Sequence, residues 1–560
     1  MKKSIRRRLF WLLAAVPLLP RVPAQPADPR VGQLLDRIVE KEQAFLESIE
    51  TRTPLIETYI QETPMPAEAG ARPAKDHYFL GRFRLAGAVS YETLVERTDP
   101  PPSKRGLRLL PRAAAPSSRP LMFLPRGFAQ MAVLDLRDFN RQTYGFEYVR
   151  REFLGDVRCL VFDVSPLHRE QPGKFVGRIW VEDRDAAIVR FNGTYVPVPT
   201  PKGAVPEIYF HFDSWRVNTG GAAWAPAQIY VEEEGAPGQD PARSSPRFKA
   251  QSRIWDYASA VTSKTEELTS MLIESAPPVR GQGESAAPLR DQAAPKDVSP
   301  LESQRAWERQ AEENLLGRLE KGGLLAPPGP VDEVLNTVVG NLIVAAKLGV
   351  ETHCRVLLTT PIESFVIGHT IVVSRGLIDV LPDETSLALA LAGELSHIAL
   401  GHPTQTQFAF NNQTMLSDPE LLQRFRFRRS PEEVREAARK TVEIMRASPY
   451  RNTAGAGLFL KALAARVSAL PRLLEANLGD QVADPDALKQ LAEFAAAAPA
   501  LDEAKLEQIA ALPLGSRVKV NPWNNRIELV QTRPLSLLSA REKMPFEVTP
   551  FVLYLTRAEK

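Results

Sequence analysis

The chain has 560 residues, of which 44% are hydrophobic and 24% charged. This composition excludes wholesale disorder, collagen and a polytopic membrane protein. The two cysteines exclude a disulfide-stapled scaffold and a cysteine-based zinc site, and they leave open whether Cys159 and Cys354 are bridged. The length predicts two large domains, and 48 prolines predict long loops or linkers.

The first 24 residues are predicted to be a cleavable signal peptide. Basic residues at positions 2, 3 and 6–8 precede the apolar stretch Leu9–Leu19, and Val22-Pro23-Ala24 has the form of a cleavage site. The apolar stretch is too short to cross a hydrocarbon core of ~30 Å as a helix. Cleavage removes six cations and changes the formal net charge from +3 to −3, so no basic field indicates nucleic acid. We expect a periplasmic or secreted protein without an integral membrane span after signal cleavage.

The N-terminal half, residues 31–270, is predicted to be an antiparallel β domain with one helix. Apolar residues recur with helical spacing from Val31 to about Glu62, which indicates an amphipathic helix. Short β-rich segments then alternate with turn residues as far as Tyr257, interrupted by a proline-rich loop at 99–120. This order, with Gly177-Arg-Ile-Trp-Val-Glu-Asp and Ile188-Val-Arg-Phe-Asn-Gly, resembles the lipoprotein carriers LolA and LolB. The resemblance implies a half-barrel that holds lipid in an apolar cavity.

The C-terminal half is predicted to be mostly helical, with a small sheet. Residues 276–300 are rich in proline, alanine, glycine and glutamine and indicate a linker. Helices are expected at 302–321, 331–348 and 383–401, and strands at 353–359 and 365–374, the second broken at Gly368. This domain spans 301–480, and the extension at 481–560 holds a helix and a hairpin turning at Asn524-Asn525. The fold class is therefore α+β with two domains.

One segment of the C-terminal half carries a motif with chemical meaning. A strand leads into Arg375-Gly376-Leu377, and the following helix reads Gly393-Glu394-Leu-Ser-His397. The segment resembles the HtpX, CAAX-protease and BepA type of zinc metallopeptidase (peptidase family M-forty-eight), whose helix carries HExxH. Residues i and i+4 share one helix face, so two histidines can bind one zinc while the glutamate polarises its water. The resemblance implies a zincin-like fold, Glu394 as general base, His397 as a ligand, and a substrate-binding edge strand. That strand comprises Phe365, Val366, Ile367 and Gly368.

The sequence departs from this family where the metal should bind. The first histidine position is Gly393, which has no side chain. The family's third ligand is a glutamate on a later helix, which here starts with the capping box of Ser430, Pro431 and Glu433. The register places Val434 at that ligand position and Ala438 at the position of its acidic partner. A catalytic zinc needs three protein ligands, so we predict an inactive site and no cofactor. If the site is active, zinc would need substitute ligands from His369, His402, Glu432, Glu433 or Glu436.

Three functions are compatible with these patterns. The first is a catalytically degenerate metallopeptidase-like protein that binds an extended peptide or a lipid-bearing envelope protein. The second is an active zinc endopeptidase of envelope protein quality control with a non-standard ligand set. The third is a lipid or lipoprotein carrier. The expected partner is thus an envelope polypeptide or a lipid, and no nucleic acid.

Overall fold

The computed structural model describes residues 29–64, 72–97, 121, 123–168, 171–197, 210–220, 223–233, 247–259, 299–410, 418–482, 484–515, 517–530 and 543–557. The predicted signal peptide, the loop at 99–120 and nearly all of the predicted linker lie outside these ranges. Within them, none of the helices combines the length and the apolar character needed to cross a membrane.

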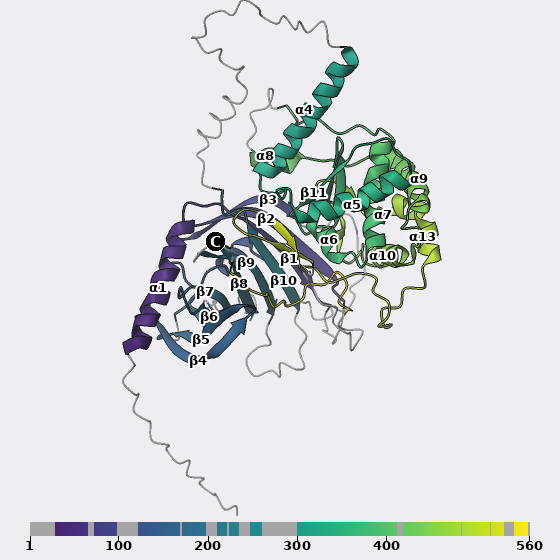
Figure 1. The fold of residues 1–560 in the computed structure, drawn as a ribbon. Helices are drawn as coiled ribbons and strands as arrows, with labels where there is room; N and C mark the ends of the chain where they lie inside the picture. Colours follow the sequence, from purple (N-terminus) through teal and green to yellow (C-terminus); the bar gives the residue numbers. More distant parts are fainter. Residues whose placement is uncertain are drawn as a thin grey trace, which may run out of the picture.

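An antiparallel sheet forms the N-terminal half, and ten of its strands lie in the described part of the chain. Their order is β3-β2-β1-β10-β9-β8-β7-β6-β5-β4, and each strand is antiparallel to its neighbours (Figure 1). This confirms the predicted antiparallel sheet and the α+β class. The strands are β1 Leu55–Glu62, β2 Lys75–Leu85, β3 Val89–Arg97, β4 Tyr144–Leu154, β5 Val157–Pro166, β6 Phe175–Glu182, β7 Ile188–Tyr195, β8 Phe210–Gly220, β9 Ala223–Glu233 and β10 Phe248–Trp255.

The prediction of one helix from Val31 to Glu62 is wrong in its second half. Helix α1 spans Pro29–Ile49, and residues from Leu55 onward form strand β1. Pro54 lies between them; a proline lacks an N–H, and it biases the residue before it toward extended backbone. Strand β1 is buried on both faces, so its apolar residues do not alternate clearly with polar ones. A strand of this kind is easily mistaken for the continuation of a helix.

One face of the sheet, here called the inner face, is covered by α1 and by α2 (Pro125–Gln130). Ile38 of α1 and Ile60 of β1 belong to the same buried cluster. Aromatic rings of β6, β7 and β8 pack edge to face within it, with ring centroids 5.8–6.1 Å apart. Helix α1 is also held by Glu42, which accepts two hydrogen bonds from Arg216 of β8, at 2.6 and 2.7 Å.

The C-terminal half contains helices around a small sheet of order β11-β13-β12-β14 in the described residues. The predicted broken strand is a hairpin, in which β12 and β13 are joined by a turn at Gly368 (φ +58°). The predicted hairpin at Asn524-Asn525 is confirmed as β15 and β16. The zincin-like domain itself is not confirmed. The strands are β11 His353–Leu357, β12 Glu363–Ile367, β13 Thr370–Ser374, β14 Asp480–Gln481, β15 Val518–Val520 and β16 Ile527–Leu529; the helices are α4 Pro300–Lys321, α5 Pro330–Ala345, α6 Arg375–Val380, α7 Glu384–Ala399, α8 Asp418–Arg424, α9 Pro431–Ala447, α10 Ala454–Ala464, α11 Pro471–Leu474, α12 Pro485–Gln490 and α13 Ala492–Ala497.

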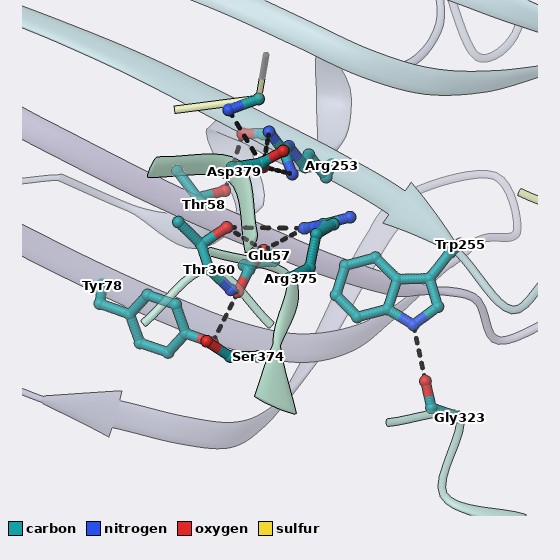
Figure 2. A network of polar contacts seen from close by, with 12 residues as sticks. Glu57, Thr58, Tyr78, Arg253, Trp255, Gly323, Thr360, Ser374, Arg375 and Asp379 are labelled. Carbon is teal, nitrogen blue, oxygen red and sulfur yellow. Dashed lines mark hydrogen bonds and ion pairs between the residues drawn. The ribbon is translucent and has the colours of Figure 1, made fainter. Parts of the chain in front are cut away.

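The opposite face of the large sheet, the outer face, is joined to the helical half by one continuous apolar cluster. Leu55, Tyr59 and Trp255 of the sheet belong to it, together with residues of α4, α5 and α7. The indole nitrogen of Trp255 donates to the carbonyl of Gly323 at 2.7 Å (Figure 2). The two halves therefore share a core.

Buried charges also cross this junction (Figure 2). Glu57 of β1 accepts hydrogen bonds from Arg375 at 2.8 Å, from the hydroxyl of Thr360 at 2.6 Å and from Tyr78 at 2.9 Å. Arg375 and Glu57 are each 1% exposed. A buried ion pair is tolerated when further hydrogen bonds satisfy its remaining atoms, as the bonds from Thr360 and Tyr78 do for Glu57. The sheet thereby fixes the start of α6, which precedes α7 in the chain.

Cys159 and Cys354 are both free thiols. They lie in separate apolar clusters, Cys159 under the outer face and Cys354 in the core shared with the helical half. Burial raises the pKa of each thiol to about 12, which keeps both protonated and unreactive.

Candidate functional site

The motif helix α7 is placed by its cap and by its neighbours. Asp383 caps its start, accepting a hydrogen bond from the Ser386 backbone at 2.8 Å. The helix packs against α9 and α10 (Figure 1), and also against β12. Glu394 and His397 lie one turn apart and are both 6% exposed. Their side chains are therefore directed into the domain, as the motif predicts for a general base and a metal ligand.

A cavity of about 230 Å³ lies between α7 and α9. Gly393, Glu394 and His397 line it from α7, and Val434 and Ala438 line it from α9. A Cβ atom added at Gly393 would meet no described atom within 4 Å. The two positions at which the family resemblance expects additional ligands, 393 and 434, thus face the same cavity. Neither residue carries an atom that can bind a metal.

The carboxyl group of Glu394 is held beside β12. The hydroxyl of Ser364 donates to its Oε1 at 2.6 Å, while its Oε2 is buried and meets no hydrogen-bond partner in the described residues. Burial, and then the negative charge of Asp480, raise the pKa of Glu394 to about 8. At neutral pH this carboxyl is mainly protonated, and a protonated acid cannot act as a general base.

His397 is held in a chain of side-chain contacts. Its Nδ1 lies 2.9 Å from Nδ1 of His402, and Nε2 of His402 lies 3.4 Å from Oε2 of Glu436. Burial, then the charge of Arg429 and the neighbouring His402, lower the pKa of His397 to about 3. The ring is therefore neutral throughout the physiological range.

The remaining proposed substitutes for the metal site are spread around it. His369 is exposed in the turn between β12 and β13 and is not among the residues lining the cavity. Glu433 caps α9, its carboxylate accepting from the backbone of Ser430 at 2.8 Å. Glu432 is exposed on the first turn of α9, and Glu436 is exposed beside His402.

A zinc ion does not fit this arrangement. Across the described ranges, no group of three or more histidine, cysteine, aspartate or glutamate side chains is arranged to hold a metal. His397 offers one ring nitrogen, and one oxygen of Glu394 is already bonded to Ser364. Since a catalytic zinc needs three protein ligands, the residues present do not supply the site that the family uses.

Two charged residues complete the polar end of the cavity, and sequence reasoning missed both. Asp480 of β14 accepts from the Arg429 backbone at 2.8 Å, and burial raises its pKa to about 6. Its Oδ2, and Nε and Nη2 of Arg429, are buried without hydrogen-bond partners in the described chain. Asp480 reaches the site because β14 pairs with β12, a two-residue pairing that leaves no periodic pattern in the sequence.

The predicted substrate-binding strand, β12, is largely enclosed. Phe365, Val366 and Ile367 are at most 2% exposed, and Gly368 lies in the turn that follows. Beside Phe365, the ring of Phe427 stacks at a centroid distance of 4.9 Å. The outer edge of β12 is paired with β14 at residues 363–364. A peptide that adds to the edge there would have to displace β14.

Similarity to known proteins is found among solved structures. No protein-family model matches the sequence. No curated protein matches it either. Among solved structures, a DUF1329 family protein from Desulfovibrio piger is similar at 13% identity and a TM-score of 0.22, covering 43% of this chain and 98% of its own. MucB is similar at 9% identity and a TM-score of 0.15, covering 41% of this chain and 94% of its own. Likenesses at these TM-scores carry no argument about function, and none of the comparisons supports a metallopeptidase relationship.

Proposed function

We propose that this protein is a non-catalytic binding protein of the cell envelope, and that its ligand site is the cavity between α7 and α9. The observation that carries the proposal is the pair of positions 393 and 434, which face an open cavity and offer no metal ligand. In this proposal the cavity lies where the sequence resemblance predicts a metallopeptidase site, but its lining residues do not supply that chemistry.

The shape of the cavity supports binding. Small side chains border it on both helices, at Ala390 and Gly393 of α7 and at Ala437 and Ala438 of α9. Leucine-sized residues at such positions would fill the space, and an empty cavity costs about 24 cal/mol per Å³. A bound ligand offsets that cost. The ligand in this proposal is an envelope polypeptide, extended or lipid-bearing, or a free lipid.

A second candidate function, a lipid carrier built on the sheet, draws on the ten antiparallel strands with α1 across one face. The inner face, however, is occupied by aromatic side chains and by α1. In our proposal acyl chains therefore bind between α7 and α9 and not between α1 and the sheet.

Elemental analysis and a casein-cleavage assay test the absence of catalysis. We expect less than stoichiometric zinc and no cleavage. The double substitution Gly393→His with Val434→Glu should create zinc binding, because both positions face the cavity. Gly340→His with Val344→Glu makes the same two residue changes on α5, away from the cavity, and as the control should bind far less. Stoichiometric zinc in the unmodified protein, lost to a chelator together with cleavage, would refute the proposal.

Native mass spectrometry of the purified protein tests the binding function. We expect a bound peptide, acylated peptide or lipid that leaves on mild activation. The substitution Ala438→Leu, which fills the cavity, should abolish that species while Glu432→Gln, on the exposed side of the same helix, leaves it unchanged. An unmodified protein without bound ligand, whose stability rises in Ala438→Leu, would contradict a binding role.

A further inference from the structure

The cavity has an apolar body and one polar end. Leu389, Phe459, Leu460 and Leu491 belong to the apolar wall. Ser364, Glu394, His397, Arg429 and Asp480 lie at the polar end, where β12, β14 and the segment before α9 meet α7. A ligand that matches both parts has an apolar chain and one polar group. Its volume, below the roughly 300–1,000 Å³ of sites for drug-sized molecules, suits a single chain.

The contacts determine which atoms at the polar end donate and which accept. Glu436 accepts from Nε2 of His402, so Nδ1 of His402 accepts from Nδ1–H of His397. Nε2 of His397 is then left as an acceptor. Oδ2 of Asp480 is a second acceptor without a partner in the described residues, and it is buried. The donors without a partner there are Nε and Nη2 of Arg429 and the protonated Oε2 of Glu394, all buried in residues that line the cavity.

The charges of the lining residues balance. Arg428 and Arg429 are cations, and Asp480 and Asp484 are carboxylates, while Glu394 is protonated at neutral pH. A charged ligand would add a charge that no lining residue is left to compensate. An ammonium group would also leave the donors of Arg429 without acceptors, and a carboxylate would leave Asp480 without a donor. Each buried polar atom without a partner lowers affinity.

We propose that the cavity binds an uncharged ligand in which an apolar chain ends in an amide, an inference that rests on the binding function proposed above. The amide carbonyl accepts from Arg429 and Glu394, and the amide N–H donates to Asp480 or His397. The same chemistry occurs in an N-acylated polypeptide and in a free amide lipid.

Isothermal titration calorimetry with probes of one chain length tests this inference. At neutral pH we expect octanamide to bind at least about tenfold more tightly than octanoate or octylammonium. Asp480→Asn should shift the preference toward octanoate, and Arg429→Gln toward octylammonium, because each removes one of the balancing charges. An N-octanoyl tripeptide that binds at least as tightly as octanamide assigns the amide to an acylated polypeptide, and weaker binding assigns it to a free lipid.

The possible outcomes distinguish a failure of this inference from a failure of the proposed binding function. Tightest binding of octanoate or octylammonium to the unmodified protein overturns the uncharged ligand and leaves the binding function standing. If no probe binds, and native mass spectrometry also finds no ligand, both fall. Circular dichroism and thermal melts of Asp480→Asn and Arg429→Gln exclude misfolding, and Ala438→Leu should lose all probes equally.

Discussion

Replacing Glu394 by glutamine should remove a specific pH dependence of stability. Glutamine has the shape of a protonated glutamate, and its Oε1 can still accept from Ser364. The pKa of Glu394 is about 8 in the folded protein against an ordinary value of 4.5. Below pH 4.5 the carboxyl is protonated in both the folded and the unfolded chain, and the substitution is then nearly neutral.

As the pH rises above 4.5, the unfolded chain loses this proton while the folded protein keeps it until about pH 8. Unfolding then releases a proton, so the unmodified protein becomes less stable with rising pH. A pKa difference of about 3.5, at about 1.4 kcal/mol each, gives an advantage for Glu394→Gln of at most about 5 kcal/mol above pH 8. Asp480 remains in both proteins, but its charge contributes to the raised pKa of Glu394, so the comparison reports the titration of this pair.

Urea unfolding at several pH values between about 5 and 9 measures the effect as the difference in free energy of unfolding between the two proteins. The difference should grow from about 1 kcal/mol or less at about pH 5 and level off above pH 8. Glu432→Gln, an exposed change on α9, should give a difference that does not vary with pH. A constant difference for Glu394→Gln, or a loss of stability at alkaline pH, would show that Glu394 is ionised when folded.

Two further predictions concern the junction between the halves. Gly376→Ala should prevent folding or cost more than about 3 kcal/mol, because the alanine Cβ would lie 1.7 Å from the carbonyl oxygen of Thr360. The control Gly340→Ala, at an open helical position, should stabilise the protein by up to about 1 kcal/mol. Urea unfolding measures both, and equal effects would contradict the close approach. Glu57→Ala should cost about 3–5 kcal/mol by leaving Arg375 buried and unpaired, and adding Arg375→Met should recover the part of the loss that comes from this charge, while the donors of Thr360 and Tyr78 stay unpaired. Thermal melts of the single and double variants test this, and additive losses would count against it.

Features that depend on a few neighbouring residues could be predicted from the sequence. The capping box of α9 forms reciprocally, with the Glu433 backbone donating to the Ser430 hydroxyl at 3.2 Å. The hairpin turn at Asn525 adopts a left-handed backbone, φ +61°, which asparagine tolerates better than most residues. Both rest on interactions within one turn of chain. The prediction that the first helix continues through Pro54 was wrong. Strand β1 is buried on both faces, so its sequence lacks the alternation of apolar and polar residues that indicates a strand.

The residues of the candidate site fall into the same two groups: those that local sequence identifies and those that only contacts between distant segments bring together. The motif spacing identified the α7 residues, and the register of α9 identified Val434, since each follows from one helix. Arg429 and Asp480 could not be found in this way. They meet Glu394 only through the pairing of β14 with β12 and the path of the chain into α9. Such contacts join distant segments, and single residues in short strands carry no local signal for them.

The roles that we propose for the two halves follow from what covers each face of the large sheet. A half-barrel that binds lipid by itself needs an open face, but α1 and aromatic rings occupy the inner face. The outer face of β1, β2 and β10 is buried against the helical half, where Glu57 binds Arg375 at the start of α6 (Figure 2). Over β4–β8 the sheet borders a hollow of about 730 Å³ whose lining includes the charged residues Glu147, Asp163 and Arg178, which an acyl chain would not match. Because α6 leads directly into α7, the sheet fixes the helix that carries Gly393 and Glu394. In the proposed function the sheet therefore supports α7, and the ligand binds in the preformed, partly apolar cavity between α7 and α9.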